Sequence, residues 1–456
     1  MALNRRQFIQ TSTLGTLGAT GLSGCLMKAN QPLTLAEVKP EHQYELLLKP
    51  GVKEIIPGKP SNVLTMNGLA PGPVIRGKQN EPIRITVVNQ LDTATTMHWH
   101  GLRIPVDMDG VPYTGQMPIE PGESFVYQFT PPDAGTMWYH PHMESVEQMG
   151  KGLVGAMVIE EAEPLEFDLD IPLVLKNWHL NEDGSFYPRS IKRYAARQGT
   201  PGLINTVNGK IKPKFSVPAG GRIRIRTINA DNTAQYQLNC EQGQVLAIDA
   251  NPIDFNQTLE SFLLGTGVRM DFGFIAPQAI GEQFTLRDGD QIIAEFEVVP
   301  SSLPTLHSQL PKIPANPVLE PNLAEAKQIS MTLEWDAATD KNGDPLFWNL
   351  KTRPGQRPAN CSYPNQIANL KLGNSYIFNI RNNTQYPHPI HFHGHTFRVL
   401  KSNKKTINPF LADTVVLEKN EQVQVGLVAD NPGFWMFHCH VIEHMISGLV
   451  GLVKVA

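Results

Sequence analysis

Ten of the chain's fourteen histidines fall into four short motifs, and the last motif also holds a cysteine. Imidazole is a ligand for copper, zinc, iron and nickel, and a thiolate favours softer ions such as copper(I) and zinc. Histidines at positions i and i+2 of a strand project from the same face, so a His-x-His pair presents two imidazoles in one direction. Chance scatter of histidines through core and surface is a poor explanation of this grouping. The motifs are His98-Trp99-His100, His140-Pro141-His142, His388-Pro389-Ile390-His391-Phe392-His393 and His438-Cys439-His440-Val441-Ile442-Glu443-His444.

The mixture of donors narrows the choice of metal. One thiolate among many imidazoles, without a Cys-x-x-Cys pair, argues against structural zinc and against an iron–sulfur cluster. Two histidines and one cysteine form the trigonal blue-copper arrangement, which Cys439, His444 and His388 can supply. His438 and His440 point to the opposite face of the strand from Cys439. One strand can therefore connect two copper sites.

Strands must position these motifs, because runs of alternating apolar and polar residues recur along the chain. Nine residues beyond the asparagine that ends such a run, the chain reaches a His-x-His pair in the first and third cases but not in the second. A glycine alignment gives the same result five residues downstream of Gly135, Gly281 and Gly433. The chain thus consists of three copies of one β unit, and the middle copy lacks ligands. The three runs with their asparagines are 83–88 with Asn89, 223–228 with Asn229 and 376–380 with Asn382.

Length and composition agree with a β protein of several domains. The 456 residues are enough for about three domains, and 37 Gly and 37 Pro favour a turn-rich β fold. A net charge of −4 gives no basic field for nucleic acid. Four cysteines are too few for a disulfide scaffold, although a Cys240–Cys361 bridge stays open. We expect domains at residues 31–163, 164–305 and 322–456.

Residues 1–30 resemble a twin-arginine export signal. Arg5-Arg6 precedes a weakly apolar stretch, 14–22, that is too short and too rich in glycine to span a membrane. This pattern predicts export to the periplasm or another extracytoplasmic location. The residues before Cys25 also resemble a lipobox, in which Cys25 is acylated and anchors the protein to the membrane. Ordinary cleavage with loss of Cys25 is the alternative.

Together the four motifs resemble those of three-domain multicopper oxidases of the bacterial laccase type, over essentially the whole mature chain. The resemblance implies an all-β fold of three consecutive cupredoxin-like Greek-key β-sandwich domains and four copper ions. The trinuclear copper cluster would lie between the first and third domains, with the middle domain as a structural spacer. The implied ligands are His388, Cys439 and His444 for the type 1 copper, His98 and His391 for the type 2 copper, His100, His140 and His440 for one type 3 copper, and His142, His393 and His438 for the other.

Two further positions bear on this resemblance. Leu449 stands where many bacterial relatives have a methionine axial to the type 1 copper, and loss of that weak donor favours Cu(I), so we expect a higher reduction potential. Asp109 matches an acidic residue that delivers protons to the cluster in this family, with a solvated turn aspartate as the alternative. The second acidic position is occupied by Met445, and whether Glu443 replaces it stays open.

The resemblance implies an enzyme that takes single electrons from a reducing substrate and reduces O₂ to water. The 14 methionines are dispersed, with none between Met270 and Met331, so no methionine-rich surface is expected to dock Cu(I). We therefore expect a phenol or aromatic amine as reductant, with oxidation of Cu(I) or Mn(II) as the alternative. A copper-free cell-envelope scaffold protein of the same fold is a rival that the retained ligands oppose. We expect a monomer that binds no nucleic acid.

Overall fold

The computed structural model describes residues 42–301, 307–359, 362 and 364–456. The twin-arginine motif, Cys25 and Cys361 lie outside these residues, so the expectations that depend on them stay predictions. Cys240 is a buried free thiol. In the part of the chain that the structure describes, every helix is too short or too polar to cross a membrane.

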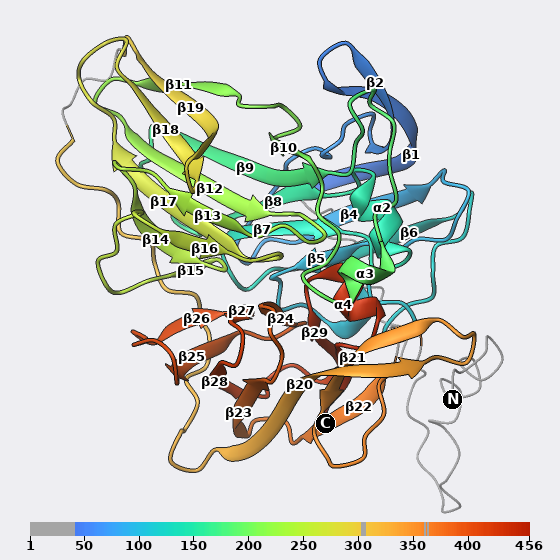
Figure 1. Ribbon diagram of the computed structural model, residues 1–456. Helices are drawn as coiled ribbons and strands as arrows, with labels where there is room; N and C mark the ends of the chain where they lie inside the picture. The colour runs from blue at the N-terminus through green and yellow to red at the C-terminus, as the bar shows by residue number, and fades with distance from the viewer. Residues whose placement is uncertain (1–41, 302–306, 360–361, 363) are drawn as a thin grey trace, which may run out of the picture.

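Strands dominate the fold and form six sheets, which follow one another along the chain as three pairs (Figure 1). We call these pairs the first unit (β1–β8), the middle unit (β9–β19) and the third unit (β20–β30). The prediction of an all-β fold is confirmed. The expected domain borders near residues 163 and 305 fall between the pairs of sheets and stay predictions.

The first unit contains two four-stranded sheets. The first sheet has the order β2 (Lys59–Met66), β1 (His42–Ile56), β4 (Ile83–Asn89) and β6 (Ser124–Phe129). The second sheet has the order β3 (Ile75–Lys78), β8 (Gly155–Glu160), β7 (Gly135–His140) and β5 (His98–His100). Two short helices accompany them, η1 (Val106–Met108) and α2 (Ser145–Gly150).

The middle unit contains a six-stranded and a five-stranded sheet, with the short helix α3 (Lys192–Ala195) beside them. The larger sheet has the order β10 (Ile204–Val207), β9 (Leu169–Trp178), β12 (Arg222–Asn229), β17 (Arg269–Ile275), β14 (Gln244–Ile248) and β15 (Asn251–Pro252). The smaller sheet has the order β11 (Lys214–Pro218), β19 (Gln291–Val299), β18 (Gln283–Asp288), β13 (Tyr236–Asn239) and β16 (Phe262–Leu264).

The third unit has the same division into six and five strands, and it holds the short helix α4 (Ile442–Ile446). Its larger sheet has the order β21 (Pro345–Lys351), β20 (Lys327–Thr339), β23 (Ser375–Asn382), β28 (Gln422–Val428), β25 (Phe397–Ser402) and β26 (Phe410–Ala412). Its smaller sheet has the order β22 (Asn365–Leu370), β30 (Val450–Val455), β29 (Gly433–Cys439), β24 (His388–Phe392) and β27 (Thr414–Leu417).

The three asparagines used to align the sequence occupy corresponding places in the three units. Asn89, Asn229 and Asn382 are the last residues of β4, β12 and β23, and each of these strands pairs in parallel with the first strand of its unit. Each buried side-chain oxygen accepts a hydrogen bond from the backbone N–H two residues later. Each amide also donates to a carbonyl about thirty residues downstream. The same bonding therefore fixes the turn that follows the central strand in each unit.

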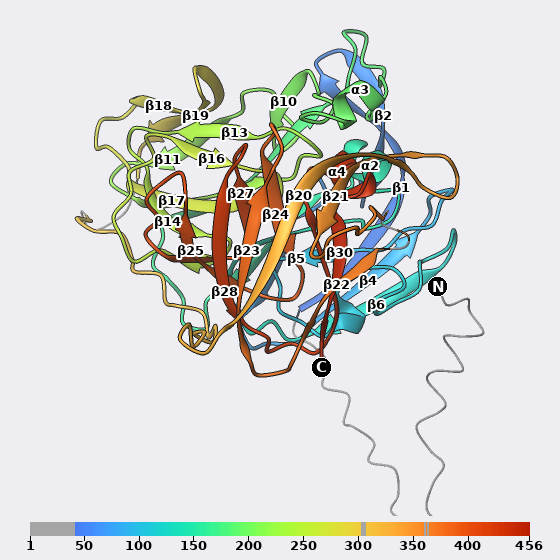
Figure 2. The same ribbon diagram turned by 60° about the horizontal axis from the view of Figure 1, so that its bottom comes forward.

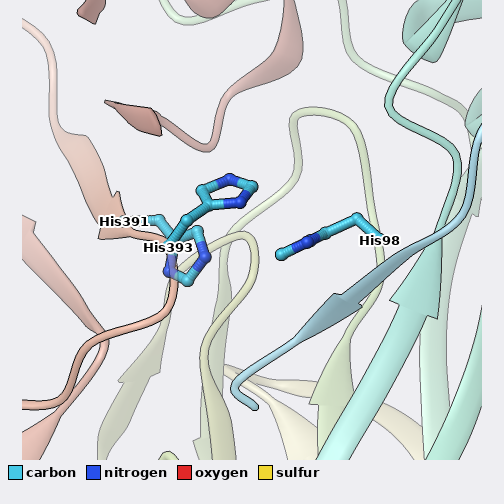
Figure 3. A group of neighbouring side chains, drawn as sticks. All are labelled: His98, His391 and His393. Carbon is cyan, nitrogen blue, oxygen red and sulfur yellow. The ribbon is translucent and has the colours of Figure 1, made fainter. Parts of the chain in front are cut away.

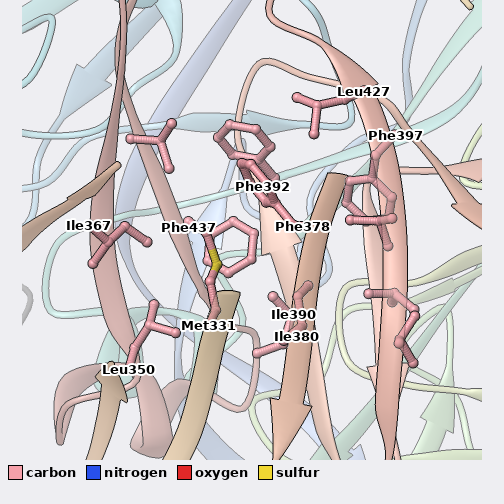
Figure 4. Close-up of a cluster of buried hydrophobic side chains, with 14 of the residues drawn as sticks. Met331, Leu350, Ile367, Phe378, Ile380, Ile390, Phe392, Phe397, Leu427 and Phe437 are labelled. Carbon is pink, nitrogen blue, oxygen red and sulfur yellow. The ribbon is translucent and has the colours of Figure 1, made fainter. Parts of the chain in front are cut away.

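Each unit encloses an apolar core, because alternate residues of its strands point between the two sheets. In the third unit this core includes Phe378, Phe392 and Phe437, whose rings gather between the sheets (Figure 4). Burying one such side chain contributes roughly 1.5–3 kcal/mol. Cys439 and Leu449 belong to the same core, so the one cysteine of the histidine motifs lies on a rigid part of the unit.

The histidine motifs lie where the first and third units face each other. In the first unit β5 pairs with β7, which places His98 opposite His140. In the third unit β24 pairs with β29, which places His391 opposite His438. Both views draw β5 close to β24 (Figures 1 and 2). Two strand pairs from distant parts of the chain therefore deliver their histidines to one interface.

Candidate metal centre

Two groups of donor side chains are buried, one within the third unit and one where the first and third units meet. We call His388, Cys439 and His444 the Cys439 pocket, since their donor atoms all lie within 4.8 Å of one another. The remaining eight motif histidines form a second group, the histidine cluster. Its members are His98, His100, His140, His142, His391, His393, His438 and His440.

The three donors of the Cys439 pocket converge on one point. Nδ1 of His388 lies 3.0 Å from Nδ1 of His444, and Sγ of Cys439 lies 3.6 Å from each of these nitrogens. β24 supplies the first histidine, β29 the cysteine and α4 the second histidine. All three side chains are fully buried. The structure thus brings together the three residues that the sequence assigns to the type 1 site.

Hydrogen bonds on the outer side of the pocket fix the protons of both imidazoles. Nε2 of His444 lies 2.8 Å from the carbonyl of Arg197, which can only accept, so Nε2 carries the proton. Nε2 of His388 lies 2.8 Å from Oγ1 of Thr384, whose own proton goes to the carbonyl of Tyr386. Both Nδ1 atoms therefore face the thiol as lone pairs. Two bare nitrogens at 3.0 Å and one sulfur fit a cation that ligates all three.

Burial keeps these groups in the neutral form. It lowers the pKa of His444 to about 3 and holds the pKa of His388 well below its ordinary value. It also raises the pKa of the Cys439 thiol far above its ordinary value. Neutral imidazoles can ligate a metal directly, whereas the buried thiol gives up its proton when a cation takes the proton's place.

Leu449 borders the Cys439 pocket through the backbone. Its carbonyl accepts a hydrogen bond of 2.9 Å from the N–H of Cys439, and its own N–H donates over 2.9 Å to the carbonyl of His444. The side chain is fully buried in the core of the third unit. A leucine has no donor atom, so it can close the pocket with hydrocarbon but cannot ligate.

The histidine cluster consists of rings in close contact from both units. His98 lies 4.0 Å from His393 between ring centroids, and His100 lies 3.8 Å from His391. Figure 3 shows His98 reaching from β5 toward His391 and His393 on the opposite strand. The first and third units therefore share this group, as the resemblance implied.

The expected pairs and triads of the cluster are close in space. Ring nitrogens of His142, His393 and His438 all lie within 4.8 Å of one another. The other expected triad also comes together, because the ring centroid of His440 lies 5.0 Å from that of His100 and 5.4 Å from that of His140. The centroids of the expected type 2 pair, His98 and His391, are 5.9 Å apart.

Most inward nitrogens of the cluster lack protein partners; the exceptions are Nε2 of His393 and Nε2 of His438, which lie 2.9 Å apart. Four of its histidines turn Nδ1 toward a backbone carbonyl, which places the proton there and aims Nε2 inward; these are His98, His140, His391 and His438. Among the described residues, several buried ring nitrogens have no hydrogen-bond partner: Nε2 of His98, His140, His142 and His391, Nδ1 of His100, and both nitrogens of His440. An unsatisfied buried polar atom costs about 1–3 kcal/mol. So many convergent lone pairs fit metal ions as their partners.

Asp109 lies against the cluster, where the sequence predicts it. Its Oδ2 lies 2.9 Å from Nδ1 of His393, and its Oδ1 lies 3.3 Å from Nδ1 of His98. The residue follows η1 and is 1% exposed, so it is not a solvated turn aspartate. Its contact with two cluster histidines puts a carboxylate in reach of the site, and its role in proton delivery stays a prediction.

A second carboxylate at the cluster, Asp413, was missed by the sequence analysis. Its Oδ1 lies 3.1 Å from Nε2 of His100 and 3.3 Å from Nδ1 of His391. Asp413 just precedes β27, which pairs with β24 so that Thr414 lies opposite His391. Since no fixed spacing links it to a histidine motif, only the pairing of these two strands reveals it.

The middle unit holds Asp413 in place. Arg269 donates to both carboxylate oxygens of Asp413, over 2.8 and 2.5 Å, and over 3.0 Å to Asp249. Asp249 also accepts from the backbone N–H groups of Asp413 and Thr414. All these side chains are buried. The middle unit thus lacks histidine ligands but reaches the cluster through a buried ion-pair network, so it is more than a spacer.

Glu443 is not a second acid at the cluster. Its carboxylate accepts hydrogen bonds from the N–H and from Oγ1 of Thr200, the latter over 2.8 Å, and so binds a segment of the middle unit. Burial raises the pKa of Glu443, while the bonds from Thr200 oppose that shift. The question that the sequence left open is thereby answered: Glu443 ties α4 to the middle unit.

Comparisons with known proteins agree with this geometry. Two family models described as multicopper oxidase match the chain, one over residues 51–164 and one over residues 333–456. The multicopper oxidase MmcO of Mycobacterium tuberculosis is 28% identical over 506 residues, covering 98% of this chain and 97% of that protein. Laccase-1 of Botryotinia fuckeliana is 27% identical over 457 residues, covering 85% of this chain and 77% of that protein.

Solved structures give the same result over nearly the whole described chain. The multi-copper oxidase of Pseudomonas thermotolerans is 42% identical with a TM-score of 0.85, covering 91% of this chain and 99% of that one. A multicopper oxidase of Campylobacter jejuni, described as a metallo-oxidase, is 25% identical with a TM-score of 0.76, covering 92% of this chain and 93% of that one. The expected cupredoxin-like architecture is confirmed by these neighbours. The chain therefore belongs to the multicopper oxidase family, as one of its bacterial laccase-like members.

Proposed function

We propose that this multicopper oxidase oxidises phenols or aromatic amines one electron at a time and couples this to the reduction of O₂ to water. The observation that carries the proposal is the Cys439 pocket, where a thiol meets two bare imidazole nitrogens, one residue from two members of the histidine cluster. Copper bound in both places supplies one-electron acceptance in the pocket and storage of several electrons at the cluster.

The proposed distribution of copper follows the donor sets. His388, Cys439 and His444 hold the type 1 ion, and His98 and His391 hold the type 2 ion. The type 3 pair is shared by the six other cluster histidines: His100, His140 and His440 on one side, and His142, His393 and His438 on the other. The lone pairs that face inward from these rings support this assignment.

Cys439 and its neighbours provide the route between the two sites. Its side chain faces the pocket, while the flanking His438 and His440 face the cluster. The carbonyl of Cys439 also accepts a hydrogen bond of 2.9 Å from Nδ1 of His438. A covalent path and a hydrogen-bonded path therefore run in parallel from the thiol to a cluster imidazole.

Asp109 is the proposed residue for holding and passing protons at the cluster. Its carboxylate contacts His98 and His393, one from each unit, so it lies at the shared face of the cluster. Because reduction of O₂ to water consumes protons, a carboxylate at this position can hold a proton beside the cluster histidines and release it there.

A laccase among the relatives and the burial of Met445 both support an organic reductant. Laccase-1 of Botryotinia fuckeliana is among the relatives. Met445, next to the pocket histidine His444, is buried and packs with Ile442 in the core, so it offers no exposed sulfur to Cu(I). The likeness to the Campylobacter jejuni metallo-oxidase keeps oxidation of Cu(I) or Mn(II) as the second candidate.

Copper counting with optical and EPR spectra tests the oxidase, and paired turnover measurements test the reductant. About four coppers per chain, an intense visible thiolate-to-copper band and separate type 1 and type 2 EPR signals are expected. Turnover on 2,6-dimethoxyphenol should exceed turnover on Cu(I), with and without added copper. A colourless protein without copper would overturn the oxidase, and faster turnover on Cu(I) would overturn only the reductant. Export of the protein and acylation of Cys25 stay predictions, which the mass of the mature N-terminus would test.

A further inference from the structure

The Cys439 pocket is covered by a segment of the middle unit. His388 and His444 are fully buried, and the residue that accepts the Nε2 proton of His444 is Arg197, just beyond α3. Trp348 of β21 packs 4.6 Å from the ring of His444, and its Nε1 donates over 2.9 Å to the carbonyl of Ala195. Ala195 is the last residue of α3, so this bond joins α3 to β21. An electron donor must therefore approach this covering segment and pass its electron through it.

The covering segment carries positive charge without acidic residues. Residues 186–200 contain four Lys or Arg and no Asp or Glu. Arg189 is paired with Glu147, whereas Lys192, Arg193 and Arg197 are exposed. This segment therefore presents three cations around the peptide group that is hydrogen-bonded to the pocket.

A second segment, which contacts the turn beside the pocket, also carries positive charge without acidic residues. Residues 345–359 contain three Lys or Arg and no acid. Lys351 is paired with Glu334, and the other two cations are exposed. This segment reaches the pocket region, because a Cβ built on Gly448, next to Leu449, would lie 3.3 Å from Pro358. The two exposed cations are Arg353 and Arg357.

These five cations form what we call the basic rim: Lys192, Arg193, Arg197, Arg353 and Arg357. Within the described ranges none of them forms an ion pair with a carboxylate. The nearby acid of α4, Glu443, is buried and bound to Thr200. The rim charge is therefore available to a ligand from solution.

We propose that the basic rim selects an anionic reductant, namely a phenol whose ring also carries a carboxylate. This inference rests on the proposed function, which it narrows to one substrate class. The carboxylate pairs with rim guanidinium and ammonium groups, and the ring lies over the segment of Arg197. The phenol gives one electron through the Arg197 carbonyl to His444 and one proton to solvent, and it leaves as a phenoxyl radical. The electrons pass on to O₂, the acceptor of the established activity.

The same charge disfavours metal cations as reductants. Cu(I) or Mn(II) would approach the pocket against five unpaired positive charges, which lowers the rate of encounter. An anion, in contrast, encounters the rim at a higher rate and binds to it more tightly. Long-range attraction between exposed charges is screened by salt, so the preference must weaken as ionic strength rises.

A matched pair of phenols tests the inference on the holoenzyme. 2,6-Dimethoxyphenol and 4-hydroxy-3,5-dimethoxybenzoate share the ring and its methoxy groups and differ by the carboxylate. The quantity compared is kcat/KM for the anion divided by kcat/KM for the neutral phenol, which removes effects on later steps. We expect this ratio to fall at least about threefold between roughly 0.01 M and 0.5 M salt. A ratio independent of salt would contradict the rim.

Variants that remove positive charge from the basic rim test whether the rim causes the preference for the anionic phenol. Replacing one rim residue, as in Arg193→Gln, should lower the ratio about two- to fivefold, and the triple change Lys192→Gln, Arg193→Gln and Arg197→Gln by about tenfold or more. Arg197→Lys should keep most of the preference, because it keeps the charge. The matched control removes three exposed lysines elsewhere and should leave the ratio unchanged: Lys210→Gln, Lys371→Gln and Lys419→Gln.

A binding measurement separates this inference from the proposed function. The probe is 3,5-dimethoxybenzoate, which has no phenol to oxidise, with 3,5-dimethoxybenzamide as its neutral partner. By calorimetry the benzoate should bind the wild type more tightly than the triple variant, and the benzamide should not distinguish them. Equal benzoate affinity in both proteins would overturn the rim even if both phenols are oxidised. If neither phenol is oxidised by a copper-loaded wild type, the proposed function fails, and the benzoate result still decides whether the rim binds anions.

Discussion

The carboxylate of Asp413 and the imidazole of His100 lie 3.1 Å apart, although 313 residues separate them along the chain. Because of this contact, the ring of His100 is turned the opposite way from most rings of the cluster. His100 turns Nε2 outward to Asp413 and leaves Nδ1 inward, whereas His98, His140 and His391 point Nε2 inward. The ion pair with Arg269 holds the pKa of Asp413 well below its ordinary value even though burial opposes this. Asp413 is thus a fixed acceptor that orients one ligand of the cluster.

Replacing Asp413 with asparagine should weaken metal binding at the cluster. An amide can present N–H instead of oxygen to His100, and it removes one partner of the buried Arg269. Loss of such an outer hydrogen-bond partner typically lowers metal affinity about 10- to 100-fold. Copper retained after dialysis against a chelator, together with the type 2 EPR signal, measures the effect.

Asp271→Asn is the control for this change. Asp271 is also buried and pairs with Arg224, but in the part of the chain that the structure describes it contacts no histidine. It should lower the unfolding temperature without releasing copper. Equal copper retention in the two variants would show that Asp413 acts on stability alone.

The Cys439→Ser variant should fold but lose both colour and activity. A hydroxyl is a poor substitute for a thiolate ligand, and the parallel paths from Cys439 to His438 lose their sulfur end. Because the cluster histidines are untouched, we expect about three coppers per chain and a remaining type 2 EPR signal. Absorption and copper content check this, with Cys240→Ser as the control for loss of a buried thiol. A blue, active Cys439→Ser enzyme would refute the proposed type 1 ligands.

Leu449→Met should lower the reduction potential of the type 1 site. The leucine lies directly beside Cys439 and His444 through two backbone hydrogen bonds, so a thioether there has the reach to become a weak axial ligand. An added donor stabilises Cu(II) over Cu(I). Redox titration of the visible band gives the potential. Leu449→Ile changes shape without adding a donor and should leave the potential near the wild-type value; an equal shift in both variants would mean that packing, not ligation, sets it.

The copper-free protein should lose stability as the pH falls from 7 to 5. Burial lowers the pKa of His438 and of His444 to about 3, whereas an unfolded histidine titrates near 6.5. Below that unfolded value the unfolded chain binds protons that the native state excludes, so stability decreases with falling pH by up to about 1.4 kcal/mol per pH unit for each such histidine. Thermal unfolding at several pH values measures the slope. In copper-free His444→Gln the slope should be smaller by the contribution of one histidine, and an unchanged slope would contradict the assignment.

The sequence predicted the elements whose signal lies within a short stretch of residues. The alternating runs at 83–88, 223–228 and 376–380 are strands, since apolar residues on one face must be buried. The His-x-His pairs reach one interface because each sits on a strand that faces the opposite unit. Asp109 was found because it follows its histidine motif closely in the chain.

What the sequence could not predict depends on contacts between units. Arg269 and Asp413 carry no spacing signal, because their pairing arises from how the middle unit packs against the third. The carbonyl of Arg197 has even less of a signal, since a backbone oxygen is the same in every residue. Glu443 looked like a candidate acid by its position next to His444, and only its bond to Thr200 shows where it points.

The sharing of the histidine cluster between β5–β7 and β24–β29 has a consequence for how the protein matures. During synthesis the first half of the ligands, residues 98–142, exists long before residues 388–444 emerge, so neither half can grip an ion firmly until the two outer units have docked. Stable copper binding at the histidine cluster therefore requires that the two units have docked. Once bound, these ions link the first and third units, and their removal should make the interface between the units sensitive to proteases before the individual sandwiches unfold.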